Sequence, residues 1–243
     1  MAGTIRRAKI NTVSYDYLKS GDLNPVSCLR IAQTIGEAWG VEDGFYVRDL
    51  MKRGRVLMMA DSVCEFGKRG CEFEGYVNGE YWANDPDGRF IKYNGYFTDS
   101  KGDYLFGIVN YFMVVDLKER RALYPKDLGA PLREGVDRTP VSDASFKIDT
   151  DIPLEFCEKR TVRRGETDAL GHVNNSYYAA YAMDNFSDED MERGFRRMVI
   201  RYSAQFRAGD GITLMKGADG RRILVRGINS AGKTGFEVNF ERR

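Results

Sequence analysis

One short segment combines residue types that can do chemistry: residues 167–175, with the sequence TDALGHVNN. Asp168 stands in a glycine-containing loop just ahead of an expected helix, where free backbone N–H groups and the helix dipole favour negative charge. A carboxylate there can attack a carbonyl carbon or activate water, and the N–H groups can bind the oxyanion that forms. The segment therefore predicts a site that can hydrolyse an acyl compound such as a thioester.

Each residue of this segment also has a plainer interpretation. A single Asp ahead of a helix is often only a cap or part of an Asx-turn, but the surrounding motif favours a catalytic role for Asp168. His172 can take part in the chemistry or can hydrogen-bond the loop, and both interpretations stay open. For Asn174 and Asn175 we favour helix capping, with the nearby backbone N–H groups as the oxyanion donors.

The elements that position this segment are indicated by periodicity. In the N-terminal half, Leu29, Ala32, Ile35 and Trp39 have helical spacing, which predicts a helix over 27–39 with Ser27 as its N-cap. Four β-rich stretches separated by turn residues follow it, at 55–66, 70–85, 89–99 and 104–117. Residues 118–150 contain three of the six prolines and have no sustained period, so they are expected to form a linker.

The C-terminal half repeats this order. A strand at 156–164 leads through the polar loop to a helix at 174–186, and strands follow at 195–206, 212–220, 221–232 and 234–242. Such self-similarity indicates a duplicated unit. We place Gly21 and Asp22 of the first half opposite Gly165 and Asp168. The N-terminal loop lacks a histidine, so Asp22 is expected to be structural and the chain to have one working site.

The motif in 167–178, TDALGHVNNSYY, resembles the signature of hot-dog thioesterases, in which Asp and then Gly-His-Val-Asn-Asn open the central helix. The duplicated organisation resembles the acyl-acyl carrier protein (ACP) thioesterases, as do 111–125 and 200–210. This resemblance implies an α+β, tandem hot-dog fold with two antiparallel sheets, each wrapped around a central helix. It also implies an N-terminal unit at 1–125, a linker at 126–150, and a C-terminal unit at 151–243 that carries the active site.

Carried over residue by residue, the resemblance implies a catalytic set of Asp168, His172 and Gln205. It places Leu170, Asn174 and Asn175 at the substrate or oxyanion. Leu170 and Gln205 depart from the family pattern: Leu170 cannot hydrogen-bond, and Gln205 cannot act as a base although it can orient water. Asp168 is accordingly expected to be the nucleophile or base.

The function implied is hydrolysis of fatty acyl-ACP to a free fatty acid in fatty acid biosynthesis. The partner would be ACP, which carries its acyl chain on 4′-phosphopantetheine, and no cofactor or metal is expected. Two alternatives stay open, an acyl-CoA thioesterase and a catalytically silent acyl-binding module. The paired units could also stand alone or form a homodimer.

Composition limits the remaining classes. The chain has 243 residues, with 37 basic and 36 acidic side chains, so its net charge of +1 gives no general attraction to nucleic acid or membrane. We expect a cytoplasmic protein that is not inserted in a membrane, since no apolar run reaches the length of a span. Local basic patches are expected around Arg221 and at 192–197. The four cysteines form no ligand motif, and they are expected to be mostly buried, apolar residues.

Four large side chains, Met58, Met59, Trp82 and Phe90, have the adaptable or aromatic character that suits an alkyl tunnel. Packing in the core is the interpretation that we favour for them.

Overall fold

A computed structural model describes residues 3–42, 47–70, 73–128 and 134–243. The first half contains β1 (Arg6–Asn11), η1 (Ser14–Asp16), α1 (Pro25–Glu42), α2 (Val47–Lys52), β2 (Arg55–Phe66), β3 (Tyr76–Ala83), β4 (Ile91–Thr98), β5 (Tyr104–Asp116), β6 (Arg121–Ala122) and η2 (Pro125–Leu128). The second contains β7 (Glu155–Thr161), η3 (Arg164–Glu166), α3 (Asn175–Met183), α4 (Asp188–Arg193), β8 (Phe195–Tyr202), β9 (Gly211–Ala218), β10 (Arg222–Asn229) and β11 (Thr234–Arg242).

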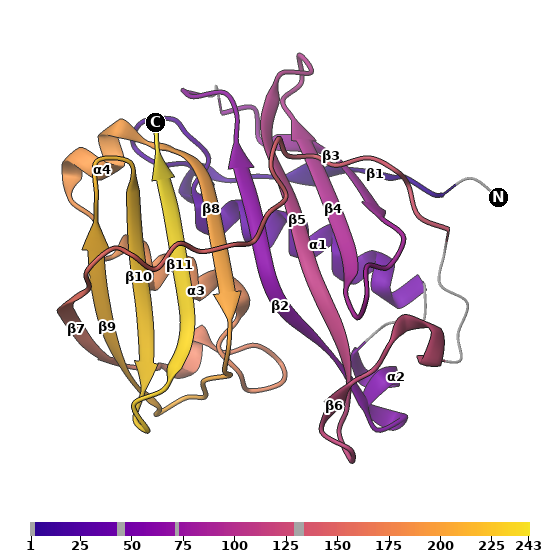
Figure 1. The fold of residues 1–243 in the computed structure, drawn as a ribbon. Helices are drawn as coiled ribbons and strands as arrows, with labels where there is room; N and C mark the ends of the chain where they lie inside the picture. Colours follow the sequence, from indigo (N-terminus) through magenta and orange to yellow (C-terminus); the bar gives the residue numbers. More distant parts are fainter. Residues whose placement is uncertain (1–2, 43–46, 71–72, 129–133) are drawn as a thin grey trace.

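The strands form one antiparallel sheet in the order β1-β3-β4-β5-β2-β8-β11-β10-β9-β7, with β6 paired to β5 (Figure 1). Read inward from the two edges of the sheet, corresponding strands follow in the same order. The first half gives β1, β3, β4, β5 and β2, and the second gives β7, β9, β10, β11 and β8. The halves meet where β2 pairs with β8, from Asp61 opposite Arg201 to Glu65 opposite Arg197. The two sheets expected from the sequence are therefore joined into one, because each half covers the other's open edge.

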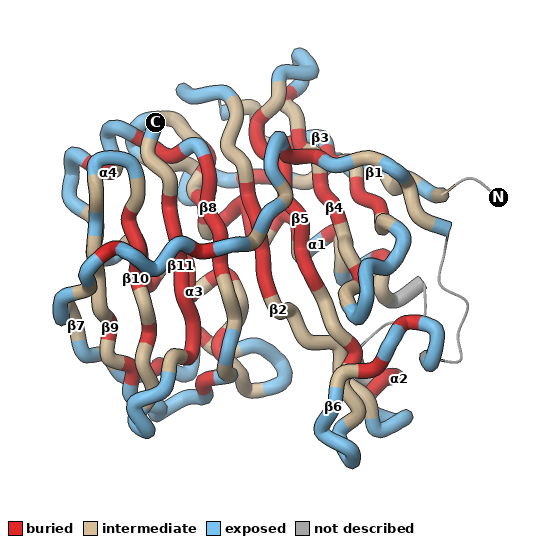
Figure 2. Tube along the Cα trace, in the orientation of Figure 1, coloured by how far each residue is buried: buried red, intermediate tan, exposed pale blue. Residues whose placement is uncertain are grey.

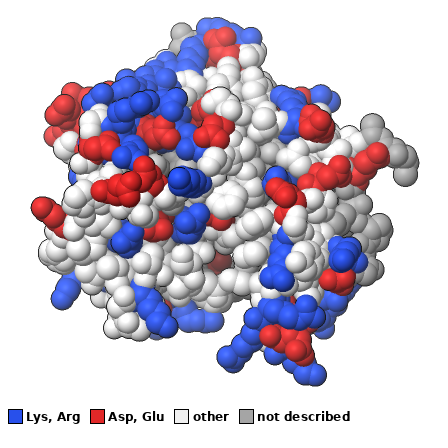
Figure 3. All heavy atoms as spheres, in the orientation of Figure 1, with Lys and Arg blue, Asp and Glu red and all other residues white. Residues whose placement is uncertain are grey.

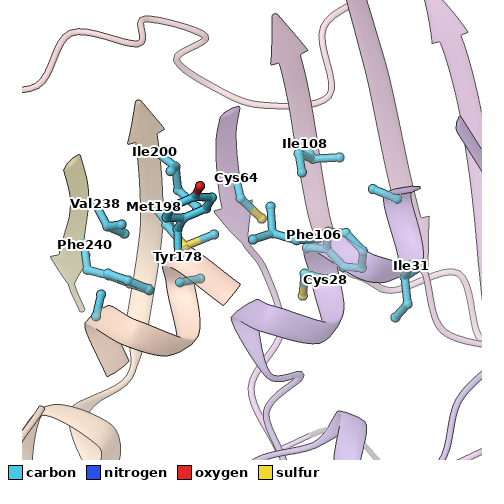
Figure 4. Close-up of a cluster of buried hydrophobic side chains, with 14 of the residues drawn as sticks. Cys28, Ile31, Cys64, Phe106, Ile108, Tyr178, Met198, Ile200, Val238 and Phe240 are labelled. Carbon is cyan, nitrogen blue, oxygen red and sulfur yellow. The ribbon is translucent and has the colours of Figure 1, made fainter. Parts of the chain in front are cut away.

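Helices α1 and α3 lie on one face of the sheet and pack against each other (Figure 1). The predicted apolar positions of α1 are buried, from Leu29 at 6% exposure to Trp39 at 4%. The helix begins earlier than predicted, because the Asn24 side chain caps it by accepting from the Val26 N–H at 3.0 Å. Figure 4 shows side chains of both helices facing the sheet, among them Cys28 of α1 and Tyr178 of α3. One core thus spans both halves.

The segment 134–154, here called the strap, crosses the opposite face of the sheet (Figure 1). Val141, Ile148 and Ile152 of the strap are buried against sheet residues that include Val63 and Val199. Figure 2 shows these buried stretches between exposed ones. As predicted, the strap has no regular secondary structure. It packs on the sheet, however, whereas a linker would be exposed to solvent along its length. Residues 129–133 of the expected linker lie outside the described residues.

Polar contacts hold the strap to the sheet. The Tyr111 hydroxyl donates to the Ala144 carbonyl at 2.6 Å, and Arg201 donates to the Phe146 carbonyl at 3.2 Å. Figure 3 shows basic and acidic side chains interleaved on this face, and Arg201 itself forms an ion pair with Asp61 across the β2–β8 junction at 3.0 Å. The contacts from Tyr111 and Arg201 give two strap carbonyls hydrogen-bond partners on the sheet.

Within the described residues, no helix has the length and apolar character needed to cross a membrane. Cys28 and Cys64 are buried and Cys157 is half-buried, all as free thiols, whereas Cys71 lies outside the described residues. Burial raises the pKa of both Cys28 and Cys157. These thiols therefore stay protonated and inert near neutral pH.

Candidate active site

The loop between η3 and α3 is a tight turn that carries Asp168 and His172. The Asp168 N–H donates to the His172 carbonyl at 2.8 Å, and the Gly171 N–H donates to the Asp168 carbonyl at 3.0 Å. Gly171 has a φ of 75°, a left-handed conformation in which a Cβ would be strained. The glycine of the motif therefore allows the turn that brings Asp168 and His172 together.

The Asp168 carboxylate has two different oxygens. Oδ1 accepts from the backbone N–H groups of Leu170 at 2.8 Å and His172 at 3.2 Å. Oδ2 has no hydrogen-bond donor among the described residues, and the side chain is exposed. Asp168 thus makes the Asx-type contacts of the plainer interpretation and keeps one oxygen free for chemistry, so the two interpretations are compatible.

His172 is half-buried next to this carboxylate. Its Nε2 atom is buried and has no hydrogen-bond partner within the described part of the chain. Burial lowers the pKa of His172 below its ordinary 6.5, the positive charge of Arg207 lowers the pKa further, and Asp168 opposes both effects. The imidazole is therefore neutral near pH 7.

Asn174 is the N-cap of α3, as favoured from the sequence. Its Oδ1 accepts from the Ser176 N–H at 3.0 Å, and its Nδ2 donates to Gln33 of α1 at 3.2 Å. Asn175 donates from Nδ2 to the sulfur of Met59 on β2 at 3.4 Å. The Asn175 backbone N–H has no acceptor among the described residues, so it is the available oxyanion donor at the helix start.

Gln205 lies on the extended segment that follows β8 and runs beside the loop. The Val173 N–H donates to the Phe206 carbonyl at 2.8 Å, and His172 forms a β-bridge with Arg207. Gln205 is exposed and makes no hydrogen bond within the described residues. Leu170 is also exposed, at 36%. The structure thus brings all the predicted residues to one end of α3, but it gives Gln205 and Leu170 no contact that defines a role.

The loop before α1 repeats the turn before α3, with each residue matching the one numbered 150 higher. The Leu18 carbonyl accepts from the Gly21 N–H at 2.8 Å, and the Leu18 N–H donates to the Asp22 carbonyl at 2.7 Å. The backbone of Asp168 makes the same two bonds with Gly171 and His172. Gly21 has a matching φ of 82°. The sequence alignment of Asp22 with Asp168 was therefore wrong: Asp22 corresponds to His172, and Leu18 corresponds to Asp168.

The N-terminal copy of the site is closed by an ion pair. Asp22 accepts from Arg69 Nε at 2.9 Å and from the Gly70 N–H at 2.8 Å. Arg69 also donates to the Glu192 and Arg193 carbonyls of the other half, at 2.8 and 2.9 Å. The cavity beside them, lined in part by Leu18 and Asp22, measures only about 20 Å³. These contacts agree with the expected structural role of Asp22.

Two of the four candidate tunnel residues lie against the strap instead. Trp82 donates from its indole N–H to the Arg138 carbonyl at 3.0 Å, and the Phe90 ring lies 5.8 Å from that of Phe146. Met59 is different, because its sulfur accepts from Asn175 at the start of α3. Only Met59 of the four is therefore shown beside the candidate site.

Sequence reasoning missed Gln33 and Arg207. Gln33 meets Asn174 across 141 positions of sequence and looks like an ordinary surface residue of an amphipathic helix, so no local pattern indicates the contact. Arg207 stands only two positions beyond the predicted Gln205. In an extended segment, alternate residues share a face, which is a signal that could have found it.

Comparison with known proteins agrees with this description. Residues 152–241 match the family model described as the acyl-ACP thioesterase C-terminal domain. The C-terminal unit belongs to the acyl-ACP thioesterase family. This confirms the resemblance seen in the sequence, and with it the coarse prediction of a hydrolase that acts on thioesters. The search of curated protein sequences gives no match.

Solved structures show that the likeness to acyl-ACP thioesterases extends over both halves. An acyl-ACP thioesterase from Bacteroides thetaiotaomicron superposes with a TM-score of 0.85 at 14% identity, covering 98% of each chain. The 12:0-ACP thioesterase from Umbellularia californica gives 0.81 at 16% identity, covering 100% of this chain and 98% of that one. At such identities the match establishes the fold, so the N-terminal half of this chain has the same arrangement as those enzymes.

Proposed function

We propose that the protein hydrolyses fatty acyl-ACP to a free fatty acid and the carrier thiol, with Asp168 as the catalytic carboxylate. The observation that carries the proposal is Oδ2 of Asp168, in the turn of the family motif ahead of α3. Among the described residues, Oδ2 has no donor and the first N–H of the helix has no acceptor. Family membership of the C-terminal unit supports the thioester, and the exposed position of the turn supports access by a bulky carrier.

In the proposed reaction, Oδ2 of Asp168 takes a proton from water while the water oxygen attacks the thioester carbonyl carbon. The negative charge formed on the carbonyl oxygen is bound by the Asn175 N–H. The carbon–sulfur bond then breaks, and the leaving thiolate receives the proton held by Asp168. Neutral His172, in the same turn as Asp168, can orient the attacking water or the carbonyl group.

The alternative role of Asp168 is direct attack, which would form an acyl-aspartyl anhydride that water then cleaves. A single turnover in ¹⁸O-water can establish direct attack. Label in Asp168 would show an anhydride hydrolysed at the aspartyl carbon, whereas label only in the fatty acid is the result for base catalysis and for an anhydride hydrolysed at the acyl carbon. Mass spectrometry of the peptide that contains residues 164–193 reads the result.

The function is tested by measuring thiol release from a matched set of acyl-ACP and acyl-CoA thioesters. We expect the wild type to turn over acyl-ACP in preference to acyl-CoA of the same chain length. Asp168→Asn keeps an oxygen that can accept the Leu170 and His172 N–H groups, so its melting temperature should change little. Its kcat should fall by about 10² to 10⁴, the range for loss of a general base.

A silent acyl-binding module is the second candidate. The observations that favour it are the two N–H bonds that occupy Asp168 Oδ1 and the absence of an acid or hydrogen bond at Gln205. Binding of acyl-ACP with no thiol release, equal in the wild type and Asp168→Asn, would establish the module. Faster release from acyl-CoA than from acyl-ACP would instead favour the acyl-CoA thioesterase.

A further inference from the structure

Several cations of the C-terminal unit are paired with carboxylates, among them two of the predicted basic patch at 192–197. Arg196 and Arg197 both bind Glu241, at 2.6 and 3.0 Å, and Arg242 binds Asp190 at 2.7 Å. The guanidinium of Arg207, like several others in this unit, has no carboxylate partner among the described residues. Its charge is therefore available at the place where it lies.

Arg207 lies beside the turn that carries Asp168 and His172. Arg207 forms a β-bridge with His172, and its Nη1 lies 3.8 Å from where a Cβ on Gly171 would be. Phe206 is buried at 2% exposure, and the exposed neighbours Gln205 and Arg207 alternate with it along an extended segment. The guanidinium thus lies against the turn, on the same face of its segment as Gln205.

Two carboxylates lie near Arg207. Asp210 accepts from the Arg207 backbone N–H through Oδ2 at 2.7 Å, and Asp168 lies in the turn itself with Oδ1 bound to the Leu170 and His172 N–H groups. Neither carboxylate forms an ion pair with the guanidinium. The positive potential at the turn is therefore not cancelled by a direct partner.

We propose that Arg207 supplies the positive charge of the hydrolytic site. Its guanidinium stabilises the anionic states of the reaction at the Asp168–His172 turn. The inference rests on the function proposed above. Hydrolysis places negative charge successively on the carboxylate, the carbonyl oxygen and the leaving sulfur. Leu170 and Gln205 supply no charge to offset it, whereas Arg207 lies close enough to do so.

Burial, and after it the positive charge of Arg207, lowers the pKa of His172, as expected for a guanidinium that lies close to the imidazole. The same positive charge lowers the free energy of an oxyanion or thiolate formed beside the turn. Because Arg207 is exposed, solvent screens it, and we expect about a tenfold contribution to kcat, equal to about 1.4 kcal/mol.

The test compares Arg207→Gln, Arg207→Lys and the matched control Arg164→Gln, which removes an exposed cation just before the same turn. The substrate is an acyl-N-acetylcysteamine thioester, which lacks both carrier protein and phosphate. We expect Arg207→Gln to lower kcat about tenfold with little change in KM. Arg207→Lys should recover most of the lost kcat, and Arg164→Gln should have the kcat of the wild type. In a further variant, Arg207→Ala, added guanidinium ion should restore part of the lost kcat.

A second measurement does not depend on turnover. The proton NMR titration of His172 should move to a higher midpoint in Arg207→Gln, because a positive neighbour has been removed. Full kcat in Arg207→Gln, or an unmoved titration, would overturn the inference. A defect confined to KM for acyl-ACP would also overturn it, and would make Arg207 a docking residue. If the wild type hydrolysed none of these thioesters, the proposed function itself would fail, which is a distinguishable result.

Discussion

Asp168 serves both the structure of the turn and, as proposed, its chemistry. The two N–H groups bound by Oδ1 fix the carboxylate, and Oδ2 is left without a donor among the described residues. This division explains why an Asx-type contact does not argue against catalysis here. It also predicts different results for two substitutions: Asp168→Ala should lose turn geometry as well as activity, whereas Asp168→Asn should lose activity alone.

His172 can be observed directly because it is the only histidine of the chain. Burial and Arg207 lower the pKa of His172, and Asp168 acts in the opposite direction. We therefore predict a midpoint below 6.5 in the wild type and a still lower midpoint in Asp168→Asn, where the stabilising negative charge is gone. Proton NMR titration of the single imidazole signal measures both, with a denatured sample as the reference. A midpoint that rises in Asp168→Asn would contradict the proposed proximity of the two side chains.

At the scale of elements, the same turn precedes both helices but supports different contacts. Before α3 it presents the exposed Asp168, and the buried Nε2 of His172 has no hydrogen-bond partner in the described part of the chain. Before α1 it presents Leu18 in place of the carboxylate, and Asp22 is held by Arg69 and by the Gly70 N–H. One copy of the turn is thus open to chemistry, and the other joins the two halves.

This difference predicts that Asp22→Ala lowers stability without lowering activity. The change removes an ion pair to a partly exposed Arg69 and leaves the Gly70 N–H without its acceptor. We expect a loss of about 1–2 kcal/mol in the free energy of unfolding, measured by urea denaturation. Asp22→Asn, which can still accept from Gly70, should lose less. A folded Asp22→Ala protein with strongly reduced kcat would show that the N-terminal turn takes part in hydrolysis.

At the scale of the whole molecule, the β2–β8 junction makes the two halves one body. The strands pair from Asp61 to Glu65, the core runs across the junction, and Gln33 of α1 binds the N-cap of α3. The candidate site therefore depends on the N-terminal half, even though the residues proposed for catalysis belong to the C-terminal half. We keep the division at 1–125 and 151–243 as a proposal about units, not about independently stable domains.

We predict that residues 150–243 produced alone will not form a stable monomer. Without β2, strand β8 becomes an exposed edge, and the apolar face of α3 loses α1. The fragment should dimerise through β8 or aggregate, as light scattering after gel filtration can show, and a full chain run in parallel is the control. A monomeric fragment with native thioester hydrolysis would contradict the claim that the halves are interdependent.

The sequence by itself determined the features that depend on local spacing. The period of Leu29, Ala32, Ile35 and Trp39 set the buried face of α1, and the motif at 167–175 located the turn, its glycine and its carboxylate. Turn residues between β-rich stretches correctly indicated an antiparallel arrangement. These features follow from contacts within a few residues, which the order of the chain alone can specify.

Only the tertiary structure decided the contacts between distant segments. It joined two expected sheets into one, packed the strap on the sheet and matched Asp22 with His172. The physical reason is that each of these contacts depends on strand register or on packing between distant parts of the chain. Neither strand register nor such packing leaves a periodic signal in the residues that meet.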